Sequence, residues 1–177
     1  MSQSVLILIS FLGLAAPASA PLTVVTNLEP ERYAGRWYEI ARLPNRFQTR
    51  CAGDVSAEYQ ARPEGGFTVV NRCREGDGRV SEAKGVARVV RGAPTSVLQV
   101  RFAPAFLSLL PSVWGDYQVM ALDDRHSYSL VGTPDRKYLW ILSRTPQMDP
   151  DRYARLLAIA GEQGFDVSKI VQTPQSR

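Results

Sequence analysis

The sequence is poor in the residues that build metal and nucleic-acid sites. It contains one histidine, two cysteines and no segment rich in lysine or arginine. One histidine and two cysteines that can pair with each other leave no nitrogen and sulfur ligand set for a metal. The net charge of +4 is small for 177 residues, and the basic residues are scattered along the chain. We therefore expect no metal, no cofactor and no nucleic-acid partner.

The chain also lacks an apolar run long enough to span a bilayer as a helix. The apolar stretch over residues 5–14 is short, and it is followed by Ala18-Ser19-Ala20, which resembles a signal-peptidase site. We predict a signal peptide over residues 1–20 and a single domain over residues 21–177. The protein should be exported to the periplasm or secreted. Because no cysteine lies near the cleavage site, we expect a soluble protein rather than a lipid-anchored one.

The two cysteines, Cys51 and Cys73, flank a strong turn at residues 62–66, Arg-Pro-Glu-Gly-Gly. A hairpin folded about that turn places them at nearly opposite positions, at the separation that a disulfide requires. In an oxidising compartment we expect the bond to form. The alternative is a reactive free thiol.

Short stretches of alternating polarity, separated by turn residues, dominate the rest of the chain. They predict eight strands, over residues 35–43, 55–61, 67–73, 81–91, 97–102, 116–122, 127–132 and 138–144. Such a series fits an all-β fold, an antiparallel up-and-down barrel that closes on itself. Asp149 and Pro150 then begin a helix that Gly164 ends, and its one apolar stripe should pack against the outer wall. A last short strand near residues 170–171 is a further expectation.

Trp37 and Arg144 lie at the start of the first strand and at the end of the last one. In a closed barrel with an even number of strands, these two strands are antiparallel neighbours. The guanidinium can then cover the indole and gain cation–π energy. We expect this pair to close one end of the barrel.

Alternation along the strands sorts inner from outer positions. In the fourth strand Glu82, Lys84 and Arg88 share one face, and the small residues Ala83, Gly85 and Ala87 share the other. Small residues facing inward indicate an interior that is not completely filled, and thus a pocket. The predicted pocket walls are Ala57, Tyr59, Val69, Ala87, Leu98, Val100, Phe102, Tyr117, Val119, Tyr138 and Trp140.

One end of the barrel should carry two long loops. The loop over residues 103–114 is unusually apolar and includes Phe106, Leu107, Leu109 and Leu110. It could line the ligand entrance, contact a membrane surface, or be buried against a second subunit in a homodimer. Alternatively, it is a flap folded onto its own barrel.

The loop after the first strand carries Phe47, and Arg42, Arg46 and Arg50 surround it. Arginines at a pocket rim suit an amphiphile with an acidic head group. The alternative is a solvated loop without a ligand.

Catalytic arrangements are weakly supported. His126 lies in a turn at the closed end, where a surface histidine is the simplest interpretation, and the side chain of Ser127 should point to the opposite face. Glu39 has the same parity as Trp37 and Ala41, so it should face inward. There it could meet a buried polar group or a ligand head group, or sit hydrated at the cavity floor. A single carboxylate without a partner acid or base does not make a hydrolase. We predict that the protein is not an enzyme.

Three segments, in order, make the chain resemble the lipocalins, and within them the branch of bacterial lipocalins and apolipoprotein D. They are residues 33–42 with the motif Gly35-Arg36-Trp37, residues 115–117 and residues 138–144. The resemblance implies an eight-stranded calyx with a carboxy-terminal helix, in which Gly35, Trp37 and Arg144 are structural. It also implies transport or storage of a small hydrophobic molecule, such as a fatty acid or a lysophospholipid, with a role in membrane maintenance. Some lipocalin-like proteins isomerise or de-epoxidise their ligands, and this is the less favoured alternative.

Overall fold

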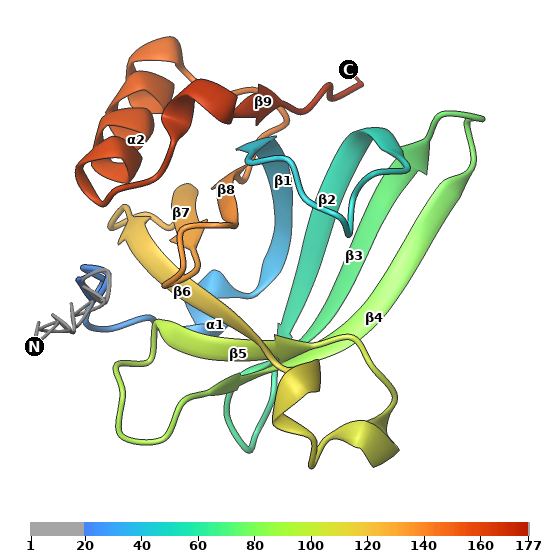
Figure 1. Cartoon of the computed structure of the whole chain (residues 1–177), viewed down its shortest axis with the longest axis vertical. Coiled ribbons are helices and arrows are strands. Elements are labelled where there is room, and N and C mark those ends of the chain that lie inside the picture. Colours follow the sequence, from blue (N-terminus) through green and yellow to red (C-terminus); the bar gives the residue numbers. More distant parts are fainter. Residues whose placement is uncertain (1–19, 177) are drawn as a thin grey trace, which may run out of the picture.

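The computed structural model describes residues 20–176 (Figure 1). The expected signal peptide, except Ala20, lies outside this part of the chain. The strands within it are β1 (Gly35–Arg42), β2 (Cys51–Ala61), β3 (Phe67–Glu75), β4 (Val80–Val89), β5 (Val97–Arg101), β6 (Gly115–Leu122), β7 (Tyr128–Gly132), β8 (Leu139–Ser143) and β9 (Val171–Gln172).

Strands β1 to β8 form the predicted antiparallel barrel. Each strand pairs with the next, β8 pairs with β1, and β1 also pairs with β2, so the sheet closes. The predicted strands match the observed ones to within a few residues at each end. The fold class expected from the alternation is therefore confirmed.

The helices are short or lie outside the barrel. Helix α1 (Pro30–Tyr33) precedes β1, and η1 (Ala105–Leu107), η2 (Pro111–Val113) and η3 (Val167–Lys169) are single 3-10 turns. Helix α2 (Pro150–Glu162) begins as predicted, with the Asp149 side chain accepting a hydrogen bond from the Arg152 amide. It lies beside β7 and β8 (Figure 1). No helix within residues 20–176 is both long and apolar enough to cross a bilayer.

Two apolar clusters occupy the two faces of the sheet. One fills the closed end of the barrel and includes Tyr33, Trp37 and Phe67. The other lies between the outer wall and α2, where Leu156 and Ala160 of the helix meet Ile141. The α2 stripe is therefore used for packing, as predicted.

A bulge in β1 changes which residues face inward. The register between β1 and β8 shifts between Glu39 and Ala41, with Ile40 as the extra residue. Trp37 and Glu39 face inward as predicted, but Ala41 turns outward into the cluster under α2. The expectation that Ala41 shares the Glu39 face is wrong, because a bulge reverses the alternation, and Arg42 faces inward instead.

The carboxy-terminal segment completes the barrel wall. Strand β1 pairs with β2 only over Gly35–Tyr38. Towards the mouth, β1 pairs with β9 in place of β2. The side-chain amide of Gln175 donates to the carbonyls of Glu39 and Val55, and so bridges the two strands. The Asp54 amide donates to the carbonyl of Pro174. Residues 171–176 thus seal the gap where β1 and β2 separate.

Candidate functional site

The closed end is built around Trp37 and Arg144, as predicted. The Arg144 guanidinium carbon lies 3.9 Å from the centroid of the Trp37 ring. Its nitrogens also donate to five backbone carbonyls, those of Arg32, Tyr33, Ala34, Arg36 and His126. Gly35 has a φ of +93°, and a Cβ there would lie 3.3 Å from Arg144 Nη1. The glycine lets the guanidinium approach the backbone, and α1 is held across the barrel end.

Aromatic rings fill the barrel above this seal. The centroid of the Tyr33 ring lies 4.9 Å from that of Trp37 and 5.5 Å from that of Tyr59, and Phe67 adjoins both tyrosines. Four of the predicted pocket residues, Val69, Ala87, Leu98 and Val119, are at most 2% exposed. They face inward as expected, but they pack against these rings in the closed half of the interior, which we call the packed floor.

The upper half of the interior is different. Ala57, Asn71 and Ala83 are neighbours across β2, β3 and β4 and form one inward-facing row, which begins at the buried Trp37 of β1. Ala57 and Asn71 are half-buried, and Ala83 is exposed although it lies mid-strand on the inner face. Solvent can reach an inward side chain in the middle of a barrel strand only if the interior beside it is open. The inner face of the mouth half is therefore accessible to solvent at Ala57, Asn71 and Ala83, and we call this accessible inner surface the mouth hollow.

Phe102 and Val100 border this hollow. A Cβ on Gly85 would come within 2.7 Å of the Phe102 ring, so the absence of a side chain at residue 85 makes room for that ring. Phe102 nevertheless keeps 42% of its surface exposed, and Val100 is half-buried. Both are available to a molecule entering from the mouth.

Three more rings form a series at the mouth. Phe47 lies 5.5 Å from Tyr138, and Tyr138 stacks on Trp140 at 6.0 Å with an interplanar angle of 8°. The Trp140 indole donates to Gln48 Oε1 at 3.1 Å. Phe47, at the outer end of the series, is 65% exposed. The predicted residues Phe47, Tyr138 and Trp140 are thus brought together.

Glu39 is buried, and it binds protein groups rather than facing an empty space. Its Oε1 accepts from Arg42 Nη1 at 2.8 Å and from the Thr173 hydroxyl, and its Oε2 accepts from Gln48 Nε2 at 2.5 Å. The carboxylate therefore joins β1, the loop after β1 and the carboxy-terminal segment. This arrangement matches the predicted pairing with buried polar groups better than contact with a ligand.

The three predicted rim arginines do not form one cluster. Arg42 pairs with Glu39, and Arg50 pairs with Glu75 at 2.8 Å. Arg46 lies over the Phe47 ring at 5.0 Å and has no carboxylate partner among the described residues. Of the three, Arg46 is therefore the cation most available to an acidic head group.

The disulfide is present, which confirms the predicted pairing of Cys51 with Cys73. Their Cα atoms lie 5.6 Å apart. The bond joins β2 to β3 at their mouth ends, beside the Arg50–Glu75 ion pair. It ties down the mouth end of the long β2–β3 hairpin.

The apolar loop over residues 103–114 is anchored at its base and exposed at its tip. The Trp114 ring lies on the outer wall, 3.8 Å from the guanidinium carbon of Arg88 and 5.3 Å from that of Arg101. Phe106, Leu109 and Leu110 are 80%, 91% and 50% exposed, and Leu107 is half-buried. The flap interpretation therefore holds for the base of the loop but not for its tip.

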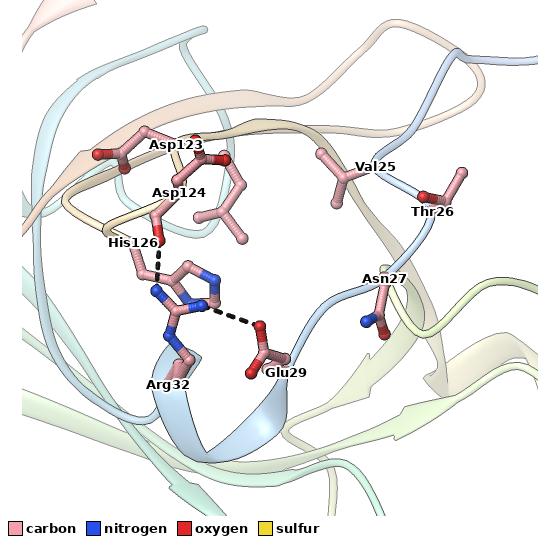
Figure 2. Close-up of a pocket in the computed structure, with 9 residues that line it drawn as sticks. Val25, Thr26, Asn27, Glu29, Arg32, Asp123, Asp124 and His126 are labelled. Atoms are coloured by element: carbon pink, nitrogen blue, oxygen red, sulfur yellow. Dashed lines mark hydrogen bonds and ion pairs between the residues drawn. The ribbon is translucent and has the colours of Figure 1, made fainter.

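Two surface cavities lie outside the barrel and do not belong to the mouth hollow. One, of about 530 Å³, lies between Ala20–Thr23, the turn at Asp135 and the end of α2. The other, of about 270 Å³, lies at the closed end (Figure 2). Figure 2 shows Arg32 reaching both Glu29 and the Asp124 carbonyl across that cavity.

His126 lines the closed-end cavity and is only 7% exposed, so the prediction of a surface histidine is wrong. His126 does lie in a turn, as predicted, but other segments of the chain cover that turn. Residues 25–32 lie across the turn, and Arg144 binds the His126 carbonyl from the other side. No group of three or more His, Cys, Asp or Glu side chains in residues 20–176 is arranged to hold a metal.

Three residues of the mouth half were missed. Asn71 faces the hollow, and its side-chain amide makes no hydrogen bond with any described residue. Gln48 links Trp140 to Glu39, and Thr173 binds Glu39 from the carboxy-terminal segment. The alternation of β3 could have identified Asn71, because it shares a face with Val69. Nothing local in the sequence points to the other two.

An antiparallel eight-stranded barrel, sealed at one end by an arginine–tryptophan pair and open at the other, defines a class of small cup-shaped binding proteins. Residues 28–175 match the family model described as a lipocalin-like domain. The chain belongs to this lipocalin-like family.

Relatives in sequence span bacteria, plants and animals. The chain is 41% identical to outer membrane lipoprotein Blc of Escherichia coli K12 over 171 residues, covering 94% of this chain and 92% of that protein. It is 41% identical to temperature-induced lipocalin-1 of Arabidopsis thaliana over 156 residues, covering 88% and 83%. It is 29% identical to mouse apolipoprotein D, covering 86% and 80%.

Solved structures agree on the fold. Insecticyanin of the tobacco hornworm Manduca sexta superposes with a TM-score of 0.66 at 20% identity, covering 89% of this chain and 86% of that one. Apocrustacyanin C1 gives 0.66 at 17% identity, covering 92% and 94%. The family membership implies binding of a small hydrophobic ligand in the barrel.

Proposed function

We propose that this protein binds and carries a fatty acid or a lysophospholipid-like molecule outside the cytoplasm. The observation that carries the proposal is the accessible inner face of the mouth half. The small side chains of Ala57 and Ala83 leave this part of the inner surface open to solvent. Burial of an acyl chain there would contribute roughly 0.8 kcal/mol per CH₂ group. We propose a binding protein rather than an enzyme, with membrane lipid maintenance as its role.

The mouth supports an amphiphile with its head group outside. Phe47, Tyr138 and Trp140 provide flat apolar surface for the upper part of the chain. Arg46 projects beside Phe47 and can meet a phosphate or carboxylate at the rim. The acyl tail would then extend past Phe102 towards the aromatic floor.

We further propose that the protein is exported, and that it is soluble in the periplasm or the medium. The signal-like segment over residues 1–20 supports export. The name of the relative Blc describes an outer membrane lipoprotein. This chain has no cysteine near its expected cleavage site, which favours a soluble form here.

Lipid extraction from native protein tests binding directly. Protein purified from its own host should show, by native mass spectrometry, a bound species that organic extraction releases as a fatty acid or lysophospholipid. Ala83→Trp should fill the hollow and abolish the bound species. Lys84→Trp adds the same ring on the outer face of the same strand and should leave the bound species unchanged.

Empty native protein that also ignores added fatty acids and lysophospholipids would contradict the proposal. Equal occupancy in the two tryptophan variants would place the ligand elsewhere on the molecule.

A second candidate function is docking to a membrane surface through the loop tip. Three exposed apolar side chains at one tip are unusual on a water-soluble surface, and the Trp114 anchor holds that tip in place. Phe106, Leu109 and Leu110 would enter the interfacial region of the bilayer. Docking and carrying are compatible, because a docked carrier could exchange lipid with the bilayer.

Liposome flotation tests the docking function. Wild-type protein should float with vesicles, and Leu109→Asp with Leu110→Asp should not. Leu109→Ser with Leu110→Ser removes the apolar surface without adding charge and should also remain unbound. Equal flotation of all three proteins would eliminate docking through this loop. A mass that doubles with concentration only in the wild type would instead indicate a homodimer formed through the loop.

A further inference from the structure

Four hydroxyl groups form a chain inside the barrel, among the buried aromatic rings of the packed floor. Tyr117 Oη lies 2.8 Å from Tyr33 Oη and 3.0 Å from Tyr59 Oη. Tyr33 Oη lies 3.2 Å from Ser129 Oγ. The order is therefore Ser129, Tyr33, Tyr117, Tyr59. These hydroxyls come from β7, α1, β6 and β2, so residues distant in sequence converge at one point.

The chain has more protons than hydrogen bonds. Four hydroxyls carry four donor protons, and the three contacts use three of them. These side chains make no other hydrogen bond with described residues. Whatever way the three bonds are oriented, one O–H is left without an acceptor. A buried donor without an acceptor is unfavourable, so the site calls for an oxygen that the protein does not supply.

The position of the spare proton depends on the direction in which the hydroxyls donate. If every hydroxyl donates in the same direction, the unused proton is on Ser129 or on Tyr59. Ser129 is completely buried, whereas Tyr59 keeps 6% of its surface exposed and its neighbour in the chain, Tyr117, keeps 8%. Tyr59 is the next inward residue of β2 below Ala57, which borders the hollow. The Tyr59 end of the chain is therefore the one that a molecule in the hollow can approach.

The phenols remain donors at physiological pH. Burial raises the pKa of Tyr59, Tyr117 and Tyr33 above their ordinary value of 10.0. None of these groups can form a phenolate near neutrality. The cluster therefore offers hydrogen-bond donation to a neutral oxygen, and it offers no charge to an acid.

We propose that the spare Tyr59 hydroxyl binds an oxygen atom at the deep end of the ligand, so that the preferred ligand is an oxygenated chain rather than a plain hydrocarbon tail. This inference rests on the proposed lipid-carrying function and names its substrate class. A ketone or ether oxygen suits the site best, because it accepts one proton and adds no further donor. A plain methyl end would leave the O–H unpaired, so the site discriminates against it.

Paired ligands and paired variants test this inference. The probes are saturated fatty acids of 10–16 carbons and the matching acids with a keto group one carbon from the methyl end. Dissociation constants for both series are measured by isothermal titration calorimetry. In wild-type protein at least one chain length should place the ketone at Tyr59. At that length, Tyr59→Phe should reduce the preference for the keto acid over the plain acid by about ten-fold, the value of roughly one buried hydrogen bond.

Two control variants separate this role from a structural one. Tyr117→Phe breaks the hydroxyl chain but keeps the Tyr59 O–H, so the preference for the keto acid should persist. Tyr153→Phe removes a phenol hydroxyl from α2, outside the barrel, and should change nothing. Urea denaturation confirms that each variant is folded. Equal loss of preference in Tyr59→Phe and Tyr117→Phe would show that the cluster acts only through stability, and would overturn the proposal.

The binding measurements distinguish a failure of this inference from a failure of the proposed carrier function. If neither series binds, the carrier function itself is wrong, and this inference falls with it. If both series bind at every length with a ratio that Tyr59→Phe leaves unchanged, the protein carries lipids but the inference is overturned. In that case an internal water molecule, and not the ligand, accepts the spare proton.

Discussion

The closed end and the mouth of this barrel use the same residue types for opposite purposes. At the closed end, Trp37 is completely buried, and Arg144 covers it while binding five carbonyls. At the mouth, Phe47 is mostly exposed, and Arg46 covers it without a carboxylate partner. Both are arginine–aromatic pairs. Only the first is enclosed by backbone and neighbouring rings.

This difference separates stability from binding. The aromatic rings inside the closed end are buried and packed against one another, so they contribute to the free energy of folding. The mouth leaves apolar surface in contact with water, which favours a ligand that can cover it. Substitutions at the closed end should therefore change stability, and matched substitutions at the mouth should change ligand affinity.

Removal of the two rings should give the largest contrast. Trp37→Ala leaves a cavity in a fully packed region and should lower the free energy of unfolding by about 4 kcal/mol. Phe47→Ala should lower it by less than about 0.5 kcal/mol, because this ring is mainly exposed. Urea denaturation, monitored by far-ultraviolet circular dichroism, measures both free energies of unfolding. Similar losses would show that the two ends are equally packed.

Replacement of the two arginines should give an intermediate contrast. Arg144→Lys keeps the charge but cannot reach five carbonyls with one ammonium group, so some of these acceptors lose their partner. We expect a loss of about 2 kcal/mol in unfolding free energy. Arg46→Lys should change stability by less than about 0.5 kcal/mol and instead weaken binding of an acidic amphiphile. An Arg144→Lys protein as stable as the wild type would show that charge alone closes the barrel.

Acidification should give the smallest effect, and one part of it should come from Asp54, which binds the carboxy-terminal segment at Ser176. The backbone amide of Ser176 donates a hydrogen bond to the Asp54 carboxylate, and the Arg74 guanidinium donates another. These bonds, together with one from the Ser176 hydroxyl, lower the pKa of Asp54 below its ordinary value of 3.8. Because the folded-state pKa lies below the unfolded one, the stabilisation is complete above about pH 4 and is lost as the pH falls through the folded-state pKa. Asp54→Asn should remove this part of the pH dependence. Unfolding midpoints of both proteins between pH 5 and pH 2.5 measure it.

The barrel was predictable because its signals are local. Alternation, turns and the pairing of Cys51 with Cys73 each depend on residues close in sequence, and the structure confirms them. Trp37 and Arg144 are far apart in sequence, but strand parity alone was enough to bring them together.

The parts that escaped prediction depend on contacts between distant segments. A single extra residue at Ile40 turned Ala41 outward, and alternation cannot reveal a bulge in advance. The seam formed by Thr173 and Gln175, and the cover over His126, arise from segments that are separate in sequence. The division of the interior into a packed floor and an open half depends on how far each ring reaches, which a sequence of inner residues does not give.

The seal at Trp37 has a kinetic consequence for any molecule held in the barrel. With that end closed by α1, by Arg144 and by the tilted rings of Tyr33 and Trp37, entry and exit share one opening. A newcomer has no route behind the occupant and must wait until the opening is vacant. The rate of exchange should therefore equal the rate of spontaneous departure, and it should not increase with the concentration of the competitor.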